Sequence, residues 1–146
     1  MVILKLSMQE IKVQNFNHLK IHTQYSICEG AIKIEDLKNF CKENKILSAG
    51  LSDTSNLCGA LEFAENLSKV GTQPIIGTQI NFKFGDTIGL IPLFALSEVG
   101  YKRIIELSSL SFLKNDELSD PHINFDELLK IEHKQLSHSL QQSTDQ

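Results

Sequence analysis

The chain lacks several features that would assign it to a particular class of protein. No apolar run approaches the ~20 residues that a membrane-spanning helix needs, and the N-terminal stretch MVILKLSMQEIKVQN has no small-residue cleavage site. We therefore expect neither a membrane span nor a signal peptide. The three cysteines, Cys28, Cys41 and Cys58, are odd in number and form no CxxC pair, which favours reduced thiols in a cytoplasmic protein. No basic stripe is present and the formal net charge is −4, so direct DNA binding by this chain alone is disfavoured.

What is present fits one domain or part of one. Of the 146 residues, 41% are apolar and 22% are charged, a balance that is typical of a chain with a packed core. The segment from His133 onward is rich in Gln and Ser and is expected to be disordered. We divide the chain into an N-terminal extension (1–15), a domain (16–131) and a polar tail (132–146), and leave open whether Met1 or Met8 is the start.

Hydrophobic periodicity predicts alternating strands and helices. Strand-type runs cover residues 17–22, 47–51, 74–82 and 88–95, and helical spacing recurs at 34–41, 60–67 and 99–112. Asn124 and Glu127 have the spacing of a capping box that would begin another helix, with Ile123 packing on Leu128. This order predicts an α/β fold in which helices lie outside a parallel sheet or barrel.

In such a fold, functional side chains come from the C-terminal ends of strands and from the loops that follow them. His22 ends the first predicted strand, and Glu29 closes the loop after it. Asp53 and Thr54 follow the second strand, and Gln79 lies on the third. These five residues are the candidate site.

Four segments, in series, resemble the motifs of the polymerase and histidinol phosphatase (PHP) family. FNHLKIHTQYSICEGAIKIEDL is similar to the first motif, in which a His-x-His pair precedes a Ser/Thr, an aromatic-Ser pair and an acidic-Gly pair. LSDTSNLCGALEF, PIIGTQINF and LFALSEVGYKRIIELSS are similar to the next three segments. The Asn-Leu-Cys-Gly stretch and the Gly-Tyr helix start resemble the branch found at the front of the α subunit of bacterial DNA polymerase III.

The resemblance implies a partial PHP-type β/α barrel, with about four strands and four helices out of a barrel of about seven strands. In the family, His and carboxylate side chains at the barrel mouth hold divalent metals such as zinc or manganese. Two or three such ions activate a water and neutralise the developing charge of a phosphate ester.

This sequence departs from that ligand pattern at four positions. Lys20 stands where the first His of the His-x-His pair is expected, and its positive charge would repel a metal. Thr54 replaces the His after Asp53, and Gln79 replaces the Glu of the third motif. Leu90 lies close to where a His of the fourth segment is expected.

His22 and Glu29 are retained, but two ligands do not hold a metal cluster, so we expect no bound metal and no catalytic residue. His18 and His22 are interpreted as hydrogen-bonded structural histidines, and Asp53 as a residue that fixes a loop through backbone N–H groups. The two cysteines near the site, Cys28 and Cys58, are interpreted as packing residues, and His133 and His138 receive no role. The alternative ligand set consists of His18, His22, Glu29, Asp53 and Cys58.

The leading hypothesis is a scaffolding PHP fragment of the polymerase α subunit, which acts in DNA replication and contains none of the palm aspartates that polymerise DNA. The resemblance implies other polymerase III subunits as partners, including the proofreading exonuclease subunit. An open barrel edge also predicts self-association. The alternatives are a stand-alone metal-dependent phosphoesterase and a gene remnant without function.

Overall fold

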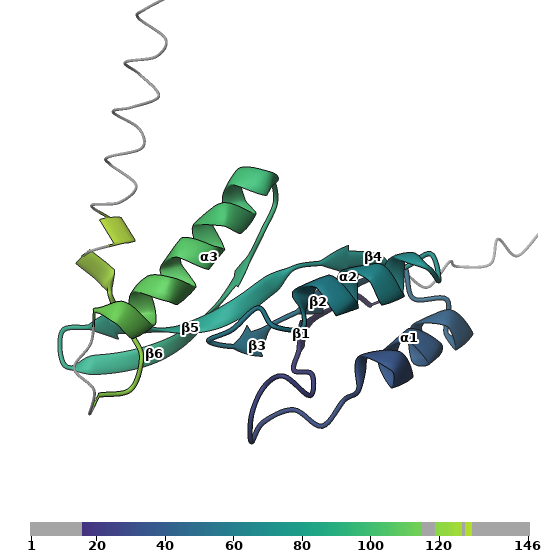
Figure 1. Ribbon diagram of the computed structural model, residues 1–146, viewed down its shortest axis with the longest axis horizontal. Coiled ribbons are helices and arrows are strands. Elements are labelled where there is room, and N and C mark those ends of the chain that lie inside the picture. The colour runs from purple at the N-terminus through teal and green to yellow at the C-terminus, as the bar shows by residue number, and fades with distance from the viewer. Residues whose placement is uncertain (1–15, 115–118, 127, 130–146) are drawn as a thin grey trace, which may run out of the picture.

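The computed structural model describes residues 16–114, 119–126 and 128–129 (Figure 1). The N-terminal extension, the polar tail, Glu127 of the predicted capping box, His133 and His138 lie outside these residues. The elements are β1 (His18–Ile21), α1 (Ile34–Glu43), β2 (Ser48–Leu51), β3 (Asp53–Thr54), α2 (Ala60–Ser68), β4 (Gln73–Ile75), β5 (Gly77–Phe84), β6 (Thr87–Phe94), α3 (Glu98–Leu113) and β7 (Ile123–Asn124).

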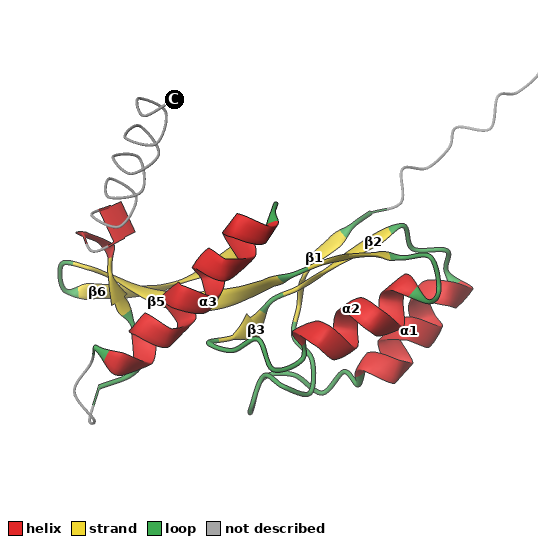
Figure 2. Ribbon diagram, turned by 45° about the horizontal axis from the view of Figure 1, so that its top comes forward, coloured by secondary structure: helices red, strands yellow, loops and turns green. Residues whose placement is uncertain are grey.

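The first sheet has three parallel strands in the order β1-β2-β4. Helices α1 and α2 pack side by side against one face of it (Figure 2). The buried side of α1 consists of Ile34, Leu37 and Cys41, the three residues whose spacing predicted the helix. Burial raises the pKa of the Cys41 thiol, so this cysteine is a packing residue and not a reactive thiolate.

The second sheet has β5 at its centre. Strand β3 and strand β7 pair parallel with β5 at different places along it, and β6 pairs antiparallel along its full length. Helix α3 crosses one face, where Ile80, Phe82, Leu107 and Ile123 form a second core. The opposite face of β6 carries Ile88 and Leu90, which are 48% and 40% exposed.

The boundary between the two sheets corrects the prediction of one strand over residues 74–82. The chain forms β4 in the first sheet, leaves it at Ile76, and begins β5 in the second sheet at Gly77. A Cβ at Gly77 would stand 2.4 Å from the carbonyl oxygen of Leu93, so only glycine allows β5 and β6 to approach this closely. Periodicity alone does not show this change of sheet, because Ile76 is the only residue between β4 and β5.

The α/β class and its parallel pairing are confirmed, whereas the strand count and the start of one strand are wrong. Seven strands are found among the described residues where about four were predicted, and β6 is antiparallel to its neighbour. The predicted strand 47–51 begins one residue later, because Leu47 precedes β2 and is 66% exposed. Ala49 and Leu51, which lie within β2, are buried in the first core.

The predicted helix near Asn124 begins directly after β7. Phe125, Asp126, Leu128 and Leu129 are helical, and Asn124 itself pairs with Lys83 as a strand residue. Leu128 packs against the cluster that contains Ile123, as the predicted apolar contact requires. Within the described part of the chain, no helix has the length and apolar character needed to cross a membrane.

Candidate functional site

Four candidate residues lie where β1, β3 and β5 bring their ends together, and the fifth lies on the loop after β1. His22 follows β1 directly, Asp53 and Thr54 form β3, and Gln79 on β5 is the register partner of Thr54. Glu29 reaches the same place from the loop between β1 and α1, as its contact with Thr54 shows. The structure thus brings these five positions close to one another.

Asp53 is fully buried and accepts three hydrogen bonds from the loop after β1. Its Oδ1 accepts from the backbone N–H of Thr23 at 2.6 Å and from Ser26 Oγ at 2.8 Å, and its Oδ2 accepts from Thr23 Oγ1 at 2.7 Å. Thr78 Oγ1 donates to the Asp53 carbonyl at 2.6 Å. The carboxylate thus ties the loop to β3, which confirms its interpretation as a loop-fixing residue.

Glu29, Thr54 and Gln79 form a directed chain of hydrogen bonds. Gln79 Nε2 donates to Thr54 Oγ1 at 2.7 Å, and Thr54 Oγ1 donates to Glu29 Oε2. Gln79 is 2% exposed, and its Oε1 has no hydrogen-bond partner among the described residues. Two of the substituted positions therefore bind each other and engage a retained carboxylate.

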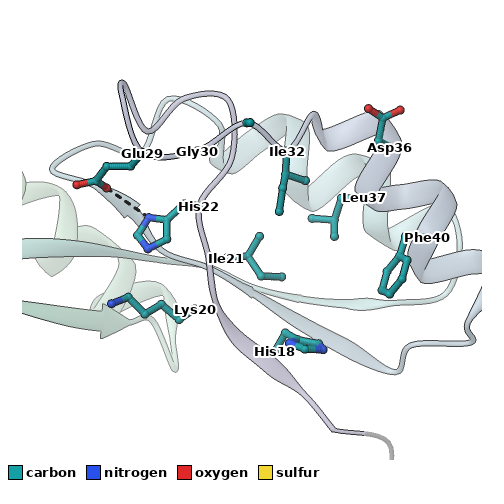
Figure 3. Close-up of a pocket in the computed structure, with 11 residues that line it drawn as sticks. His18, Lys20, Ile21, His22, Glu29, Gly30, Ile32, Asp36, Leu37 and Phe40 are labelled. Atoms are coloured by element: carbon teal, nitrogen blue, oxygen red, sulfur yellow. Dashed lines mark ion pairs between the residues drawn. The ribbon is translucent and has the colours of Figure 1, made fainter.

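His22 lies beside these hydrogen-bonded residues but contacts them only at longer distances. Its Nδ1 lies 3.4 Å from Ser26 Oγ and 3.6 Å from Glu29 Oε2, and the side chain is 22% exposed (Figure 3). Lys20 is exposed and points away from the apolar side chains of α1 in the same view. His18 was expected to bond a backbone group or a carboxylate. Its ring instead contacts the ring of Phe16 edge-on, with the two ring centroids 4.8 Å apart.

The loop geometry depends on Gly30. A Cβ at this position would stand 2.1 Å from the Thr23 carbonyl oxygen, a distance that no side chain tolerates. Gly30 N–H and Glu29 N–H both donate to the Ser26 carbonyl, which folds Glu29 back toward Thr54. The acidic-Gly pair of the first motif therefore has a local structural reason.

The remaining candidate ligands are not assembled into a metal centre. Cys28 and Cys58 are both exposed, and Leu90 lies on β6 opposite Asn81. Among residues 16–114, 119–126 and 128–129, no group of three or more His, Cys, Asp or Glu side chains is arranged to hold a metal ion. The structure thus does not assemble the five residues of the alternative ligand set.

Three residues that organise the site were not singled out from the sequence. Thr23, Ser26 and Thr78 are each fully buried and all bond to Asp53. The Thr-x-x-Ser spacing after β1 is visible in the sequence and belongs to the first motif. The sequence alone does not show its role, because Thr23 and Asp53 are 30 residues apart and only the fold brings them together.

Tyr25, from the same loop, bonds to helix α2. Its hydroxyl donates to Glu62 Oε2 at 2.6 Å. This hydrogen bond, together with the negative charge of Glu62, raises the pKa of Tyr25 above 10.0. The loop after β1 is therefore attached to both β3 and α2.

Comparison with known proteins agrees with the motif analysis. The PHP domain family matches residues 18–143. DNA polymerase III subunit alpha from Rickettsia felis is 41% identical over 118 residues, which are 80% of this chain and 10% of that protein. The same subunit from Caulobacter vibrioides is 38% identical over 122 residues, with 78% of this chain and 11% of that protein covered. The chain thus spans about a tenth of the length of the curated relatives it matches.

A solved structure supports the fold. A protein from Bifidobacterium adolescentis, assigned as a metal-dependent phosphoesterase, aligns with a TM-score of 0.50 at 16% identity. The alignment covers 65% of this chain and 34% of that protein. The chain belongs to the PHP domain family and is homologous to the PHP region of DNA polymerase III subunit alpha.

Proposed function

We propose that this chain is a polymerase III α-type PHP unit that has lost its metal centre and serves in DNA replication as a scaffold, without catalysing a reaction itself. The observation that carries the proposal is the hydrogen-bond chain from Gln79 through Thr54 to Glu29. The family resemblance implies metal ligands at positions 54 and 79. In this chain the side chains at these two positions hydrogen-bond to each other, and Thr54 also hydrogen-bonds to the retained carboxylate of Glu29.

The chemistry of the neighbouring residues supports this reading. Metal ligands at such a site must offer lone pairs, and a Lys ammonium offers only donors and a positive charge. Lys20 therefore works against cation binding at its position. Asp53 cannot turn toward an ion without releasing the bonds to Thr23 and Ser26 that hold the loop.

We further propose that the two sheets are part of a PHP-type β/α barrel, as the structural similarity to the Bifidobacterium protein supports. Other polymerase III subunits, including the proofreading exonuclease subunit, are the partners that the relatives suggest, and the cytoplasm is the expected location. Direct duplex DNA binding is not expected, because phosphate contacts dominate non-specific affinity and the net charge is −4.

Hydrolysis assays test the catalytic half of this proposal. The full chain is incubated with bis(p-nitrophenyl) phosphate and with a 3′-labelled single-stranded oligonucleotide, each with added Zn²⁺ or Mn²⁺. We expect rates equal to those of the metal ions alone. Metal-dependent hydrolysis that disappears in a His22→Ala variant would overturn the proposal.

Such a result would favour the alternative, a metal-dependent phosphoesterase. The observation in its favour is that His22 Nδ1 and Glu29 Oε2 remain within 3.6 Å of each other. A matched His122→Ala variant, which changes an exposed histidine outside this site, separates loss of a ligand from loss of any histidine.

A further inference from the structure

Two neighbouring segments hold large apolar side chains in solvent. Ile27, on the loop after β1, is 86% exposed, and Leu61, in the first turn of α2, is 73% exposed. Cys28, on the same loop, and Cys58, just before α2, are also exposed. These four residues are called the rim patch. Figure 1 and Figure 2 show the loop after β1 projecting from the molecule below the start of α2.

Hydrogen bonds tie the two segments of the rim patch to each other. Asn56 Nδ2 donates to the Tyr25 carbonyl at 3.0 Å, while Asn56 Oδ1 accepts from the Cys58 N–H at 3.0 Å. The Tyr25 hydroxyl donates to Glu62, and a Cβ built at Gly59 would stand 2.6 Å from the Tyr25 ring. Tyr25 therefore fixes the loop after β1 against the start of α2.

The base of the loop is fixed as well. The buried Asp53 carboxylate accepts from the Ser26 hydroxyl, and the Ser26 carbonyl accepts from the N–H groups of Glu29 and Gly30 at 3.1 and 3.0 Å. The loop is thus ordered before any partner arrives, which lowers the entropy cost of binding. Apolar side chains that are gathered in solvent on such a surface are typical of a protein interaction site.

The rim patch is not an edge that further strands of a barrel would pair with. None of its four residues belongs to a strand: two lie on the loop after β1, one lies on the loop after β3, and one lies in a helix. Their side chains are covered only when something docks on the loops and on the first turn of α2.

The charge beside the rim patch restricts which partner fits. Residues 21–32 and 46–68, which form this surface, contain no Lys or Arg. Glu65 is exposed and lies four residues after Leu61, on the same face of α2, whereas Lys69 is at the other end of the helix. A partner that covers Leu61 therefore meets a carboxylate, and a Lys or Arg side chain complements it.

A second copy of the rim patch does not complement this charge. Two-fold pairing places the same surface against itself, so acidic side chains would face acidic side chains across the contact.

From the exposure, the bonding and the charge, we propose that the rim patch is a docking surface for another protein. The docking segment of that protein carries apolar side chains, which cover Ile27 and Leu61, flanked by a Lys or Arg that pairs with Glu65. The proposal is independent of the proposed loss of the metal centre, because neither Ile27 nor Leu61 takes part in the hydrogen-bond chain from Gln79 to Glu29.

Peptide titration tests the proposal on the full chain, with EDTA and a reducing agent present. The probe is a fluorescein-labelled peptide of leucine and arginine, and its control has glutamate in place of arginine. We expect fluorescence anisotropy to show binding of the arginine peptide only. Ile27→Ser and Leu61→Ser should each weaken it at least about five-fold, as loss of an apolar anchor does, and Leu113→Ser, which changes an 80% exposed leucine on α3, should not.

The charge and the order of the loop are tested separately. Glu65→Lys should weaken binding more than Glu43→Lys, which makes the same charge change at the exposed end of α1. Tyr25→Phe keeps the ring but removes the bond to Glu62, and should weaken binding about three-fold because the free loop is less ordered.

Methyl resonances locate the bound peptide. Those of Ile27 and Leu61 should shift during the titration, and those of Leu113 should stay in place. Absence of binding, equal affinity for both peptides, unchanged affinity in Leu61→Ser, shifts confined to other surfaces, or a peptide-free dimer that Leu61→Ser disrupts would each overturn the proposal.

Discussion

The bonds of Asp53 predict that its replacement destabilises the whole domain. In Asp53→Ala, three donors lose their acceptor: the Thr23 backbone N–H, the Thr23 hydroxyl and the Ser26 hydroxyl. These donors belong to residues with no exposed surface, so water does not replace the carboxylate. The loop after β1 would lose its attachment to β3.

The size of the effect follows from which donors can find other partners. A buried donor without an acceptor costs about 1–3 kcal/mol. The backbone N–H of Thr23 is fixed in place and bears the full penalty, whereas the two hydroxyls can rotate and bear part of it. We expect Asp53→Ala to lower the free energy of unfolding by about 3–5 kcal/mol, a large part of the ~5–15 kcal/mol that a domain typically has.

Urea unfolding followed by circular dichroism measures this loss. Asp53→Asn should be milder but still destabilising, because its amide group presents hydrogens to at least one donor. Asp86→Asn, an exposed change in the β5–β6 turn, serves as the control and should stay within about 0.5 kcal/mol of the parent. A loss below about 1 kcal/mol in Asp53→Ala would refute the idea that these donors depend on the carboxylate.

Three further outcomes are expected. Gly30→Ala should lower the melting temperature strongly, because its Cβ would meet the Thr23 carbonyl at 2.1 Å, while Gly89→Ala, with nothing within 4 Å, should not. Glu62→Gln should lower the pKa of Tyr25, which tyrosinate absorbance measures. In the parent chain, the stability that comes from the raised pKa of Tyr25 is complete below pH 10.0 and is lost as the pH rises through the folded-state pKa. Ile88→Thr should reduce self-association in light scattering, because Ile88 is 48% exposed on the uncovered face of β6.

For each of these predictions, a specific result would contradict the reasoning. Equal melting temperatures for the two glycine variants would show that the loop moves aside. Glu65→Gln, an exposed change on the same helix, should leave the Tyr25 titration unchanged, and a matching shift there would contradict the assigned cause. A parent chain that is monomeric at all concentrations would refute the predicted self-association.

The helices and the parallel strands were predictable because the apolar spacing alone determines which face is buried. Ala60, Phe63 and Leu67 are buried on α2 as their spacing requires. The two-sheet arrangement was not predictable, because it depends on the close approach at Gly77 and on hydrogen-bond partners distant in sequence. The two-residue strands β3 and β7 are too short to produce a periodic pattern.

The location of the candidate site was predictable because strand ends collect at one edge, but its bonding was not. The sequence shows that Thr54 and Gln79 stand where other residues are expected, and it does not show that they bond to each other. That contact depends on the pairing of β3 with β5.

The central claim is that the polar residues at the ends of β1, β3 and β5 bind one another and no metal. Elemental analysis of the full chain, purified without chelators and then dialysed against Zn²⁺ or Mn²⁺, tests it most directly. We predict no stoichiometric metal in the parent chain or in His22→Ala. Stoichiometric zinc or manganese in the parent chain that His22→Ala abolishes would contradict the account.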